Sequence, residues 1–157
     1  MTRRQSAGIL LYRKKLETPE IFLVHPGGPF WKNKDREAWS IPKGEFADGE
    51  DPLTAAKREF YEETGYEISG KFVALNSILL KSGKKVFAWA INKDIDLKNI
   101  ISNHFEMEWP PRSGKLQSFP EVDKGEWFSF EIAKEKINGR QVELIEQLQQ
   151  MLEEGIM

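Results

Sequence analysis

Three glutamates, Glu59, Glu62 and Glu63, fall within five consecutive residues of this sequence. Side chains at positions i, i+3 and i+4 of an α-helix share one face, so a helix here would bring the three carboxylates to one patch. Clustered carboxylates repel one another and raise one another's pKa values unless a cation neutralises them. Mg²⁺ is a hard cation that characteristically joins a few protein carboxylates to substrate phosphates. The cluster therefore predicts a magnesium site for phosphate chemistry.

The alternative interpretation is an ordinary solvated acidic helix face. The apolar stripe of this helix would be Leu53, Ala56 and Phe60. The glutamates lie about a quarter-turn from that stripe at 3.6 residues per turn, which places them at the edge of a buried face, where a site can form. A solvated face also gives no reason for Gly44 and Gly49 in the preceding loop. These features favour the metal site.

The stretch around the glutamates, GEFADGEDPLTAAKREFYEETGY, resembles the signature of the Nudix hydrolases. That signature reads G-x5-E-x7-R-E-U-x-E-E-x-G-U, where U is a bulky apolar residue. Its fixed positions are all filled, by Gly44, Glu50, Arg58, Glu59, Phe60, Glu62, Glu63, Gly65 and Tyr66. Tyr66 is aromatic where an aliphatic residue is more usual. The resemblance implies cleavage of a nucleoside diphosphate linked to another group, by attack of water on phosphorus.

The resemblance also implies roles for the residues of this motif. Two or three Mg²⁺ ions, for which Mn²⁺ is a possible substitute, would be held by three carboxylates and one backbone carbonyl, those of Glu59, Glu62, Glu63 and Lys43. Such ions bridge phosphate oxygens and lower the pKa of a bound water. Arg58 is expected to support catalysis by pairing with a carboxylate, and Arg58 and Glu50 together would orient the unit.

A further acidic residue outside the motif is implied by the resemblance, as a metal ligand or general base. It often lies six residues before a Trp that opens a late strand, and Glu121 holds that position relative to Trp127. Glu106 and Glu108 are competing candidates, and Asp123 is a weaker one. Each of them has the alternative of being an ordinary surface carboxylate. We expect Glu121 to fill the role.

The segment His25–Lys32, HPGGPFWK, is a candidate for substrate binding. Together with WSIPKGE and a WPP segment, it resembles a subgroup of bacterial Nudix proteins. Its glycines and prolines shape a loop whose amides could meet phosphate. Lys32 and Lys43 are expected to contact a polyphosphate. An aromatic face accepts any nucleobase, and the candidates for stacking are Phe30, Trp31 and Trp109. The alternative is that these aromatic side chains pack loops against the core.

The substrate is less well defined by the sequence. The Pro42-Lys43-Gly44 entry to the motif resembles MutT-like oxidised-nucleotide pyrophosphatases and dinucleoside polyphosphate hydrolases. We therefore expect a Mg²⁺-dependent pyrophosphohydrolase acting on a diadenosine polyphosphate or a nucleoside triphosphate. One alternative is an RNA 5′-pyrophosphohydrolase, although the net acidic charge argues against a broad nucleic-acid surface. A second alternative is a non-catalytic Nudix module that senses nucleotides.

The helix that carries the glutamates has clear end signals. Asp51 and Pro52 are typical of an N-cap followed by the first helical position, where proline loses no hydrogen bond. Gly65 suits a left-handed residue just past the C-terminus. The preceding segment, Trp39–Gly44, is predicted to be a short strand running into a loop, because Pro42 favours an extended neighbour. Loop, helix and loop would form one rigid unit.

The remaining elements alternate between strands and helices. Apolar runs predict strands over Ala7–Arg13, Ile21–Val24, Lys71–Leu80, Lys85–Ile91 and Glu126–Phe130. A short helix is predicted over Glu131–Ile137, and an amphipathic C-terminal helix over Arg140–Glu154. By resemblance this order implies the α/β fold of Nudix proteins, an α/β/α sandwich with a mixed sheet, one catalytic helix and a C-terminal helix.

Length and composition fit these expectations. The chain of 157 residues is suited to one domain over residues 1–157, with a formal net charge of −2 and no cysteine. The charge offers no bulk attraction for nucleic acid, so we expect no nucleic-acid partner other than a 5′ end of RNA. No apolar run is long enough for a membrane span, and the absence of thiols excludes disulfides. We expect a cytoplasmic monomer or weak dimer that takes a small nucleotide substrate.

Overall fold

The computed structural model describes residues 4–15 and 18–155. Its centre is a seven-stranded mixed sheet formed by β1 (Gln5–Lys15), β2 (Thr18–Pro26), β3 (Lys43–Glu45), β4 (Val73–Ala74), β5 (Ile78–Leu79), β6 (Lys85–Asn92) and β9 (Val122–Ser129). The main strand order is β4-β6-β1-β2-β9, with β3 beside β1 and β5 beside β6. Only β1 and β6 run parallel; the other described pairs are antiparallel.

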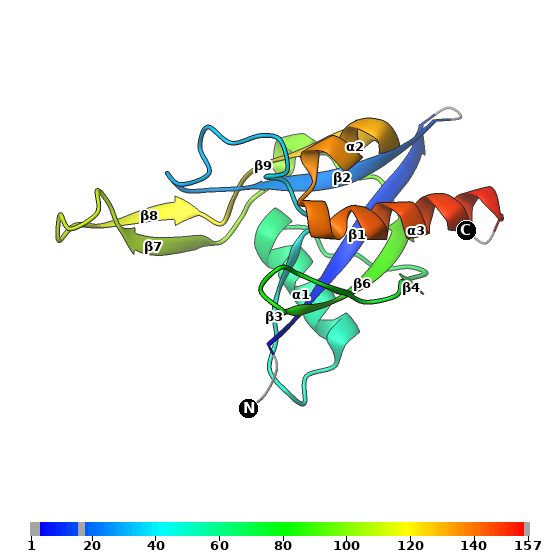
Figure 1. Cartoon of the computed structure of the whole chain (residues 1–157), viewed down its shortest axis with the longest axis horizontal. Coiled ribbons are helices and arrows are strands. Elements are labelled where there is room, and N and C mark those ends of the chain that lie inside the picture. Colours follow the sequence, from blue (N-terminus) through cyan, green and yellow to red (C-terminus); the bar gives the residue numbers. More distant parts are fainter. Residues whose placement is uncertain (1–3, 16–17, 156–157) are drawn as a thin grey trace.

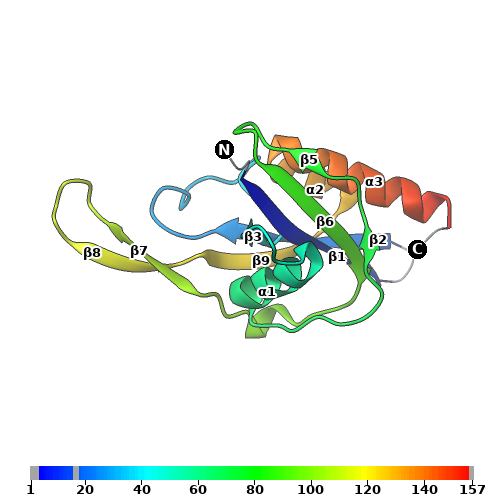
Figure 2. The same cartoon turned by 90° about the horizontal axis from the view of Figure 1, so that it is seen from below.

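Helices cover both faces of this sheet, with α1 (Pro52–Thr64) on one face and α2 (Phe130–Lys136) and α3 (Val142–Glu153) on the other (Figure 2). Because successive side chains of a strand point to opposite faces, β1 contributes to two cores. Ile9 and Leu11 pack in the core under α1, and Leu10 and Tyr12 pack in the core under α2 and α3. The predicted α/β/α sandwich is confirmed.

Helix α1 begins and ends where the sequence predicts. The Asp51 carboxylate accepts a hydrogen bond from the Thr54 backbone N–H at 3.0 Å, and Pro52 occupies the first turn. Gly65 ends the helix in the left-handed region with φ 81°, and its N–H donates to the Tyr61 carbonyl. These caps satisfy backbone groups that a helix end leaves without intrahelical partners. They fix the ends of the helix that carries the glutamates.

The strand predicted over Trp39–Gly44 begins further along the chain than expected. Trp39 and Ser40 make only isolated bridges, and the strand itself, β3, begins at Lys43. Pro42 has no N–H to contribute to a ladder, so pairing with β1 is limited there to its carbonyl, which accepts from Ile9 at 3.1 Å. The pairing of β3 with the first half of β1 sets Lys43 opposite Gly8.

The predicted strand over Lys71–Leu80 is reduced to two short strands, β4 and β5, each paired with β6. Between them the backbone of Asn76 leaves the sheet and hydrogen-bonds the side chain of Gln147 on α3, with its N–H 2.7 Å from Oε1 and its carbonyl 3.1 Å from Nε2. A side chain of α3 thus replaces the neighbouring strand as the partner of this residue.

A two-stranded ribbon, β7 (His104–Glu108) and β8 (Leu116–Pro120), projects from the body of the molecule (Figure 1). These two strands were not predicted from the sequence. The two strands pair antiparallel over five residue pairs, from His104 opposite Pro120 to Glu108 opposite Leu116. We call this ribbon the arm. A short 3-10 turn, Leu97–Asn99, precedes it.

The C-terminal elements follow the predicted order. β9 begins at Val122, earlier than the predicted Glu126, because its pairing with β2 extends from Ser129 opposite Glu20 to Val122 opposite Pro26. Ser129 caps α2, and a 3-10 turn at Gly139–Gln141 leads into α3. Within the part of the chain that the structure describes, no helix has the length and apolar content needed to cross a membrane.

Candidate functional site

The centre of the site is the contact between β3 and α1. Lys43 and Gly44 lie on β3, and the Lys43 backbone N–H donates to the Glu63 carboxylate at 3.3 Å. A Cβ at Gly44 would lie 2.1 Å from the carboxyl carbon of Glu59. Only glycine leaves room for Glu59 at this position, so β3 and α1 can approach closely enough to bring Glu59 and Glu63 to one place.

Arg58 connects the carboxylates of this unit. Its Nε and Nη2 each lie 3.2 Å from a carboxylate oxygen of Glu50, which makes a bidentate ion pair. Its Nη1 lies 2.9 Å from a carboxylate oxygen of Glu59 and 3.2 Å from one of Glu62. Paired guanidinium and carboxylate groups hold each other in a fixed orientation. The pKa of Arg58 is raised, chiefly by its hydrogen bond to Glu50. Arg58 and Glu50 lie where an orienting role is possible.

Burial and repulsion disfavour the negative charges of the site. Glu59 is only 8% exposed, and burial, followed by repulsion from Glu62, raises its pKa to about 7. The pKa of Glu63 is raised to about 8 by burial and then by Glu59. Burial and Glu62 also raise the pKa of Glu121. Burial lowers the pKa of Lys43, against the attraction of Glu63.

These groups fit a divalent cation by their chemistry. The described residues contain no set of three acidic or histidine side chains already gathered as metal ligands, and Arg58 engages Glu59 and Glu62. Yet carboxylates that burial and mutual repulsion disfavour are groups that an added positive charge would stabilise. Carboxylate oxygens are also the donors that Mg²⁺ prefers. The donor set therefore suits the metal predicted from the sequence.

Glu121 is held beside these carboxylates by a series of backbone hydrogen bonds. The Glu62 carbonyl on α1 accepts from the N–H of Asn103 at 2.7 Å, and the Asn103 carbonyl accepts from the N–H of Glu121 at 2.8 Å. The Glu121 carbonyl in turn accepts from the N–H of Gly27 at 2.9 Å. This series links the end of α1, the base of the arm and the loop after β2. It places Glu121 at the junction of all three.

The competing acidic residues lie elsewhere. Glu106 and Glu108 are exposed on β7 and line none of the cavities around Glu63. The Asp123 carboxylate is 2.9 Å from Nδ1 of His25, whose Nε2 lies 2.6 Å from the Lys34 carbonyl oxygen. His25 is buried, so this contact ties the loop after β2 to β9. Of the four candidates, Glu121 is the one that lines the same cavities as Glu63.

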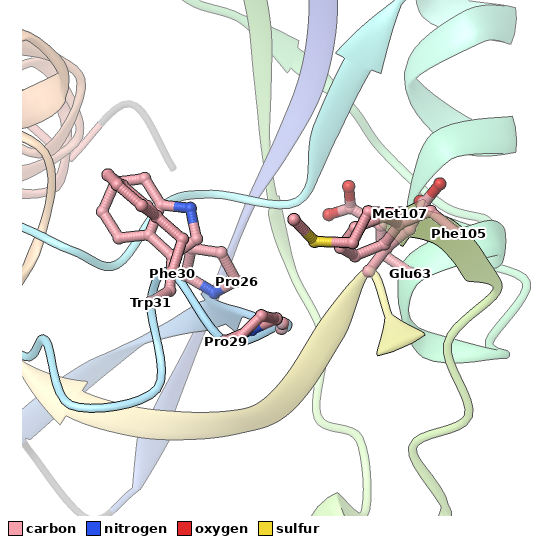
Figure 3. Close-up of a pocket in the computed structure, with 10 residues that line it drawn as sticks. Pro26, Pro29, Phe30, Trp31, Glu63, Phe105 and Met107 are labelled. Atoms are coloured by element: carbon pink, nitrogen blue, oxygen red, sulfur yellow. The ribbon is translucent and has the colours of Figure 1, made fainter. Parts of the chain in front are cut away.

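A cavity of about 490 Å³ opens beside Glu63 and Glu121 (Figure 3). One wall is the loop Pro26–Trp31 and the other is the arm, from which Phe105 and Met107 point into the space. Trp31, predicted to bind substrate, lines this cavity. Lys32 and Trp109 do not line it: Lys32 is exposed, and Trp109 follows the end of β7.

Two smaller cavities adjoin the first. One of about 170 Å³ is lined by Lys43, Glu63 and Glu121 among others, and one of about 380 Å³ is lined by Lys43, Trp31 and Lys81 among others. Glu63 and Glu121 both line the first cavity and the smallest one, and Lys43 is shared by the smallest cavity and the third.

Phe105 and Met107 are the site residues that the sequence analysis missed. The segment His104–Glu108 reads HFEME, in which apolar and polar side chains alternate. Strict alternation is the signal of a half-exposed strand. Reading it as a strand would have placed Phe105 and Met107 on one face and Glu106 on the other, as the structure has them.

Comparison with known proteins agrees with this geometry. The family model of the NUDIX domain matches residues 2–148. The chain belongs to the Nudix family. The family resemblance inferred from the sequence is therefore confirmed, and the match covers most of the chain.

Among curated Nudix relatives, "Nudix hydrolase 7" of Arabidopsis thaliana is 30% identical over 132 residues, which are 79% of this chain and 44% of that protein. An RNA pyrophosphohydrolase of Agrobacterium fabrum is 62% identical over 29 residues, 18% of this chain and 17% of that protein. The matches therefore span less than half the length of either relative. A solved Ap4A hydrolase of C. elegans, in a binary complex, shares the fold with a TM-score of 0.63 and 22% identity, over 95% of this chain and 97% of that one.

Proposed function

We propose that this Nudix protein is a Mg²⁺-dependent pyrophosphohydrolase that cleaves a phosphoanhydride bond of a nucleoside polyphosphate by attack of water on phosphorus. The observation that carries the proposal is the close approach of β3 to α1, which brings Glu59 and Glu63 together near Glu121, with Glu63 and Glu121 lining two of the cavities. Membership of the Nudix family supports the same reaction.

Each residue of the site has a role in this proposal. Glu59, Glu62, Glu63 and Glu121, with the backbone carbonyl of Lys43, would hold Mg²⁺ or Mn²⁺. When bound, the metal neutralises phosphate charge and lowers the pKa of water. Arg58 would keep Glu59 and Glu62 oriented, as its contacts allow. Glu121 is the proposed general base: a carboxylate oxygen takes the proton from the attacking water. The Lys43 ammonium would attract a phosphate oxygen.

The substrates we propose are a diadenosine polyphosphate and a nucleoside triphosphate, oxidised deoxynucleotides included. The cavities support a polyphosphate, because the space lined by Lys43, Glu63 and Glu121 shares lining residues with both of the other cavities. A chain of phosphates would lie beside these residues while its ends extend into the adjoining spaces. The fold shared with the C. elegans Ap4A hydrolase is compatible with this choice.

A second candidate is hydrolysis at the 5′ end of RNA. One observation favours it, the 62% identity over 29 residues to the Agrobacterium RNA pyrophosphohydrolase. The formal net charge of −2 argues against a broad nucleic-acid surface. A nucleotide-sensing module without turnover is a third candidate, and the retention of Glu59, Glu62 and Glu63 argues against it. The cytoplasmic location and the monomer or weak dimer expected from the sequence stay predictions.

A turnover panel separates these candidates. Phosphate or nucleotide release is measured for diadenosine tetraphosphate, nucleoside triphosphates, oxidised dGTP, ADP-ribose and 5′-triphosphate RNA, each with Mg²⁺ and with EDTA. We expect turnover of the first two classes with Mg²⁺ and none with EDTA. Preferred turnover of the RNA would replace the proposal by the second candidate. Binding of a nucleotide without turnover of any substrate would establish a sensor.

A further inference from the structure

The largest cavity beside the carboxylates has unusual walls. Phe30 and Trp31 form part of the loop side, and Phe105 and Met107 form the arm side. Phe30 is 62% exposed, although large apolar side chains tend to be buried. The apolar groups therefore face each other across an open space of about 490 Å³, within the range of small-ligand sites.

The arm side of the cavity is held in a defined position. The ring of Phe105 packs against Phe119 of β8, with ring centroids 6.0 Å apart. On the loop side a Cβ at Gly28 would lie 3.0 Å from the tip of the Phe105 ring, so this ring rests directly against the glycine backbone. Gly28 also has φ +96°, a conformation that other residues rarely adopt. The arm and the loop therefore meet at Gly28 and Phe105.

The loop side carries aromatic rings and a positive charge. Phe30 and Trp31 pack edge to face with centroids 5.2 Å apart. The Lys34 ammonium lies 3.6 Å from the Phe30 ring centroid and 5.2 Å from that of Trp31. Figure 3 shows Phe30 and Trp31 on one side of the space and Phe105 and Met107 on the other. Because Glu63 and Glu121 line the same cavity, a flat apolar group between these walls would lie close to both carboxylates.

From these contacts we infer that the cavity between loop and arm is a nucleobase site that holds the base by stacking, without selecting among bases. The chemical reason is the lack of hydrogen-bonding side chains. Of the side chains that line the cavity, only Trp31, Glu63 and Glu121 have polar atoms, and the two glutamates belong to the proposed metal site. Stacking accepts every nucleobase because each has a π face. This inference rests on the proposed function for the position of the phosphates.

The inference also narrows the substrates. Oxidation of guanine changes the hydrogen-bonding edge of the base and leaves a flat ring to stack. A site that reads only the flat face therefore gives an oxidised guanine nucleotide no preference over the ordinary one. It accepts adenine, guanine, cytosine and uracil with affinities that follow stacking strength, purines before pyrimidines. Such a site also contributes little to the binding of a triphosphate that carries no base.

Equilibrium binding tests this inference without requiring turnover. Isothermal titration with Mg²⁺ compares methylene-bridged, nonhydrolysable analogues of ATP, GTP, CTP and UTP, an analogue of oxidised GTP, and inorganic tripolyphosphate. The four bases should bind within about tenfold of one another, the oxidised guanine within about threefold of guanine, and tripolyphosphate at least about tenfold more weakly than ATP. Phe105→Ala and Phe30→Ala should each weaken binding of all four bases by about tenfold and leave tripolyphosphate unchanged.

Two further variants complete the test. Leu116→Ala is the control on the arm: Leu116 is 71% exposed and lies away from the cavity, so its loss should change nothing. Phe105→Leu keeps the apolar contact with Gly28 and removes the ring, so it should weaken base binding while the fold is retained. A preference of a hundredfold for one base, or binding of tripolyphosphate as tight as that of ATP, would overturn the inference.

The outcomes separate this inference from the proposed function. If the analogues bind in the expected pattern while no substrate of the turnover panel is hydrolysed, the base site stands and the proposed function fails. If polyphosphates are hydrolysed while Phe105→Ala and Phe30→Ala leave base binding at the wild-type level, the proposed function stands and the base site is wrong.

Discussion

At the scale of single residues, the site depends on the absence of one side chain. Gly44 leaves the space in which the Glu59 carboxylate lies, and even a methyl group there would overlap it at 2.1 Å. The neighbouring Lys43 supplies a backbone N–H to Glu63. A small residue and a backbone donor on β3 thus position two acidic side chains of α1. This explains why the motif needs a glycine fifteen residues before Glu59.

The first residue-scale prediction concerns Glu63. We expect Glu63→Gln to lower kcat by several orders of magnitude, because the amide keeps the volume of the side chain and loses the charge that the metal requires. Steady-state kinetics of the most rapidly cleaved substrate provides the measurement, with EDTA abolishing and Mg²⁺ or Mn²⁺ restoring wild-type turnover. Circular dichroism verifies that the variant is folded. Wild-type turnover in a folded variant would exclude Glu63 as a metal ligand.

The second residue-scale prediction concerns Glu121. If it takes the proton from water or completes the metal site, Glu121→Gln should reduce kcat far more than it raises KM, by about 10² to 10⁴. Glu106→Gln and Glu108→Gln are the matched controls on the exposed face of the arm and should retain wild-type kinetics. A collapse of activity in either control, with Glu121→Gln active, would transfer the role to the arm.

At the scale of elements, α1 is a rigid support because both of its ends are fixed. Beyond the Gly65 cap, the chain returns and its Ile101 N–H donates to the Thr64 carbonyl at 2.9 Å. The backbone series through Asn103 and Glu121 starts from the same end of α1. The end of the helix therefore sets the position of Glu121, the proposed general base, as well as that of Glu59, Glu62 and Glu63.

The element-scale prediction concerns Gly65, whose φ is 81°. Gly65→Val should lower the free energy of unfolding by about 1–3 kcal/mol, since a β-branched residue is penalised at positive φ. A Cβ there would also lie 3.2 Å from the Ile101 carbonyl oxygen. Gly83→Val is the control, with φ 89° and open space around it. Urea denaturation should show the larger loss for Gly65→Val, and equal midpoints for this variant and wild type would contradict the cap.

The elements also show where sequence reasoning succeeds and where it stops. The ends of α1 were predictable because Asp51 and Gly65 act on their own neighbours in the chain. The division of Lys71–Leu80 was not, because it depends on Gln147, 71 residues from its partner Asn76. Tyr66 departs from the aliphatic pattern, and the structure gives its hydroxyl a partner, the Asp96 carbonyl at 2.7 Å. Residues close in the sequence determine the ends of the helix, whereas a contact between residues far apart in the sequence determines where the strand breaks.

The same distinction applies to the site. Glu59, Glu62 and Glu63 could be gathered from helical spacing alone. The cavity could not, because its walls come from the loop Pro26–Trp31 and from the arm, which are far apart in the sequence. Trp109 was a reasonable stacking candidate by residue type, yet it does not line this cavity, and Phe105 does. Only the pairing of β7 with β8 reveals which aromatic side chains face the carboxylates.

At the scale of the whole molecule, the sandwich brings acidic side chains from two parts of the chain to one place. β3 and α1 position Glu59, Glu62 and Glu63, and the junction before β9 positions Glu121. In the absence of metal, these clustered negative charges destabilise the folded protein, because the pKa values of Glu59 and Glu63 are raised to about 7 and 8. The stability of the metal-free protein should therefore depend on pH.

The whole-molecule prediction follows from the sign of these shifts. Glutamate has an ordinary pKa of 4.5, so between pH 4.5 and 8 the folded protein retains protons that the unfolded chain releases. The stability that Glu59 and Glu63 contribute is then fully present below about pH 4.5 and is lost as pH rises to about 8. Asp35 and Asp51 have lowered pKa values and contribute a slope of opposite sign, confined below their ordinary value of 3.8.

Thermal unfolding in EDTA at pH 5, 6, 7 and 8 should therefore show a Tm that falls by at least about 3 °C over this range. Mg²⁺ at pH 8 should raise the Tm again, because a cation at the carboxylates stabilises their charged form. Glu63→Gln is the control, because it removes the group with the larger pKa shift. In EDTA its Tm should change less with pH than that of wild type, and Mg²⁺ should raise its Tm less. A Tm in EDTA that is constant or rises from pH 5 to 8, with no response to Mg²⁺, would mean that the buried carboxylates do not form a cation site.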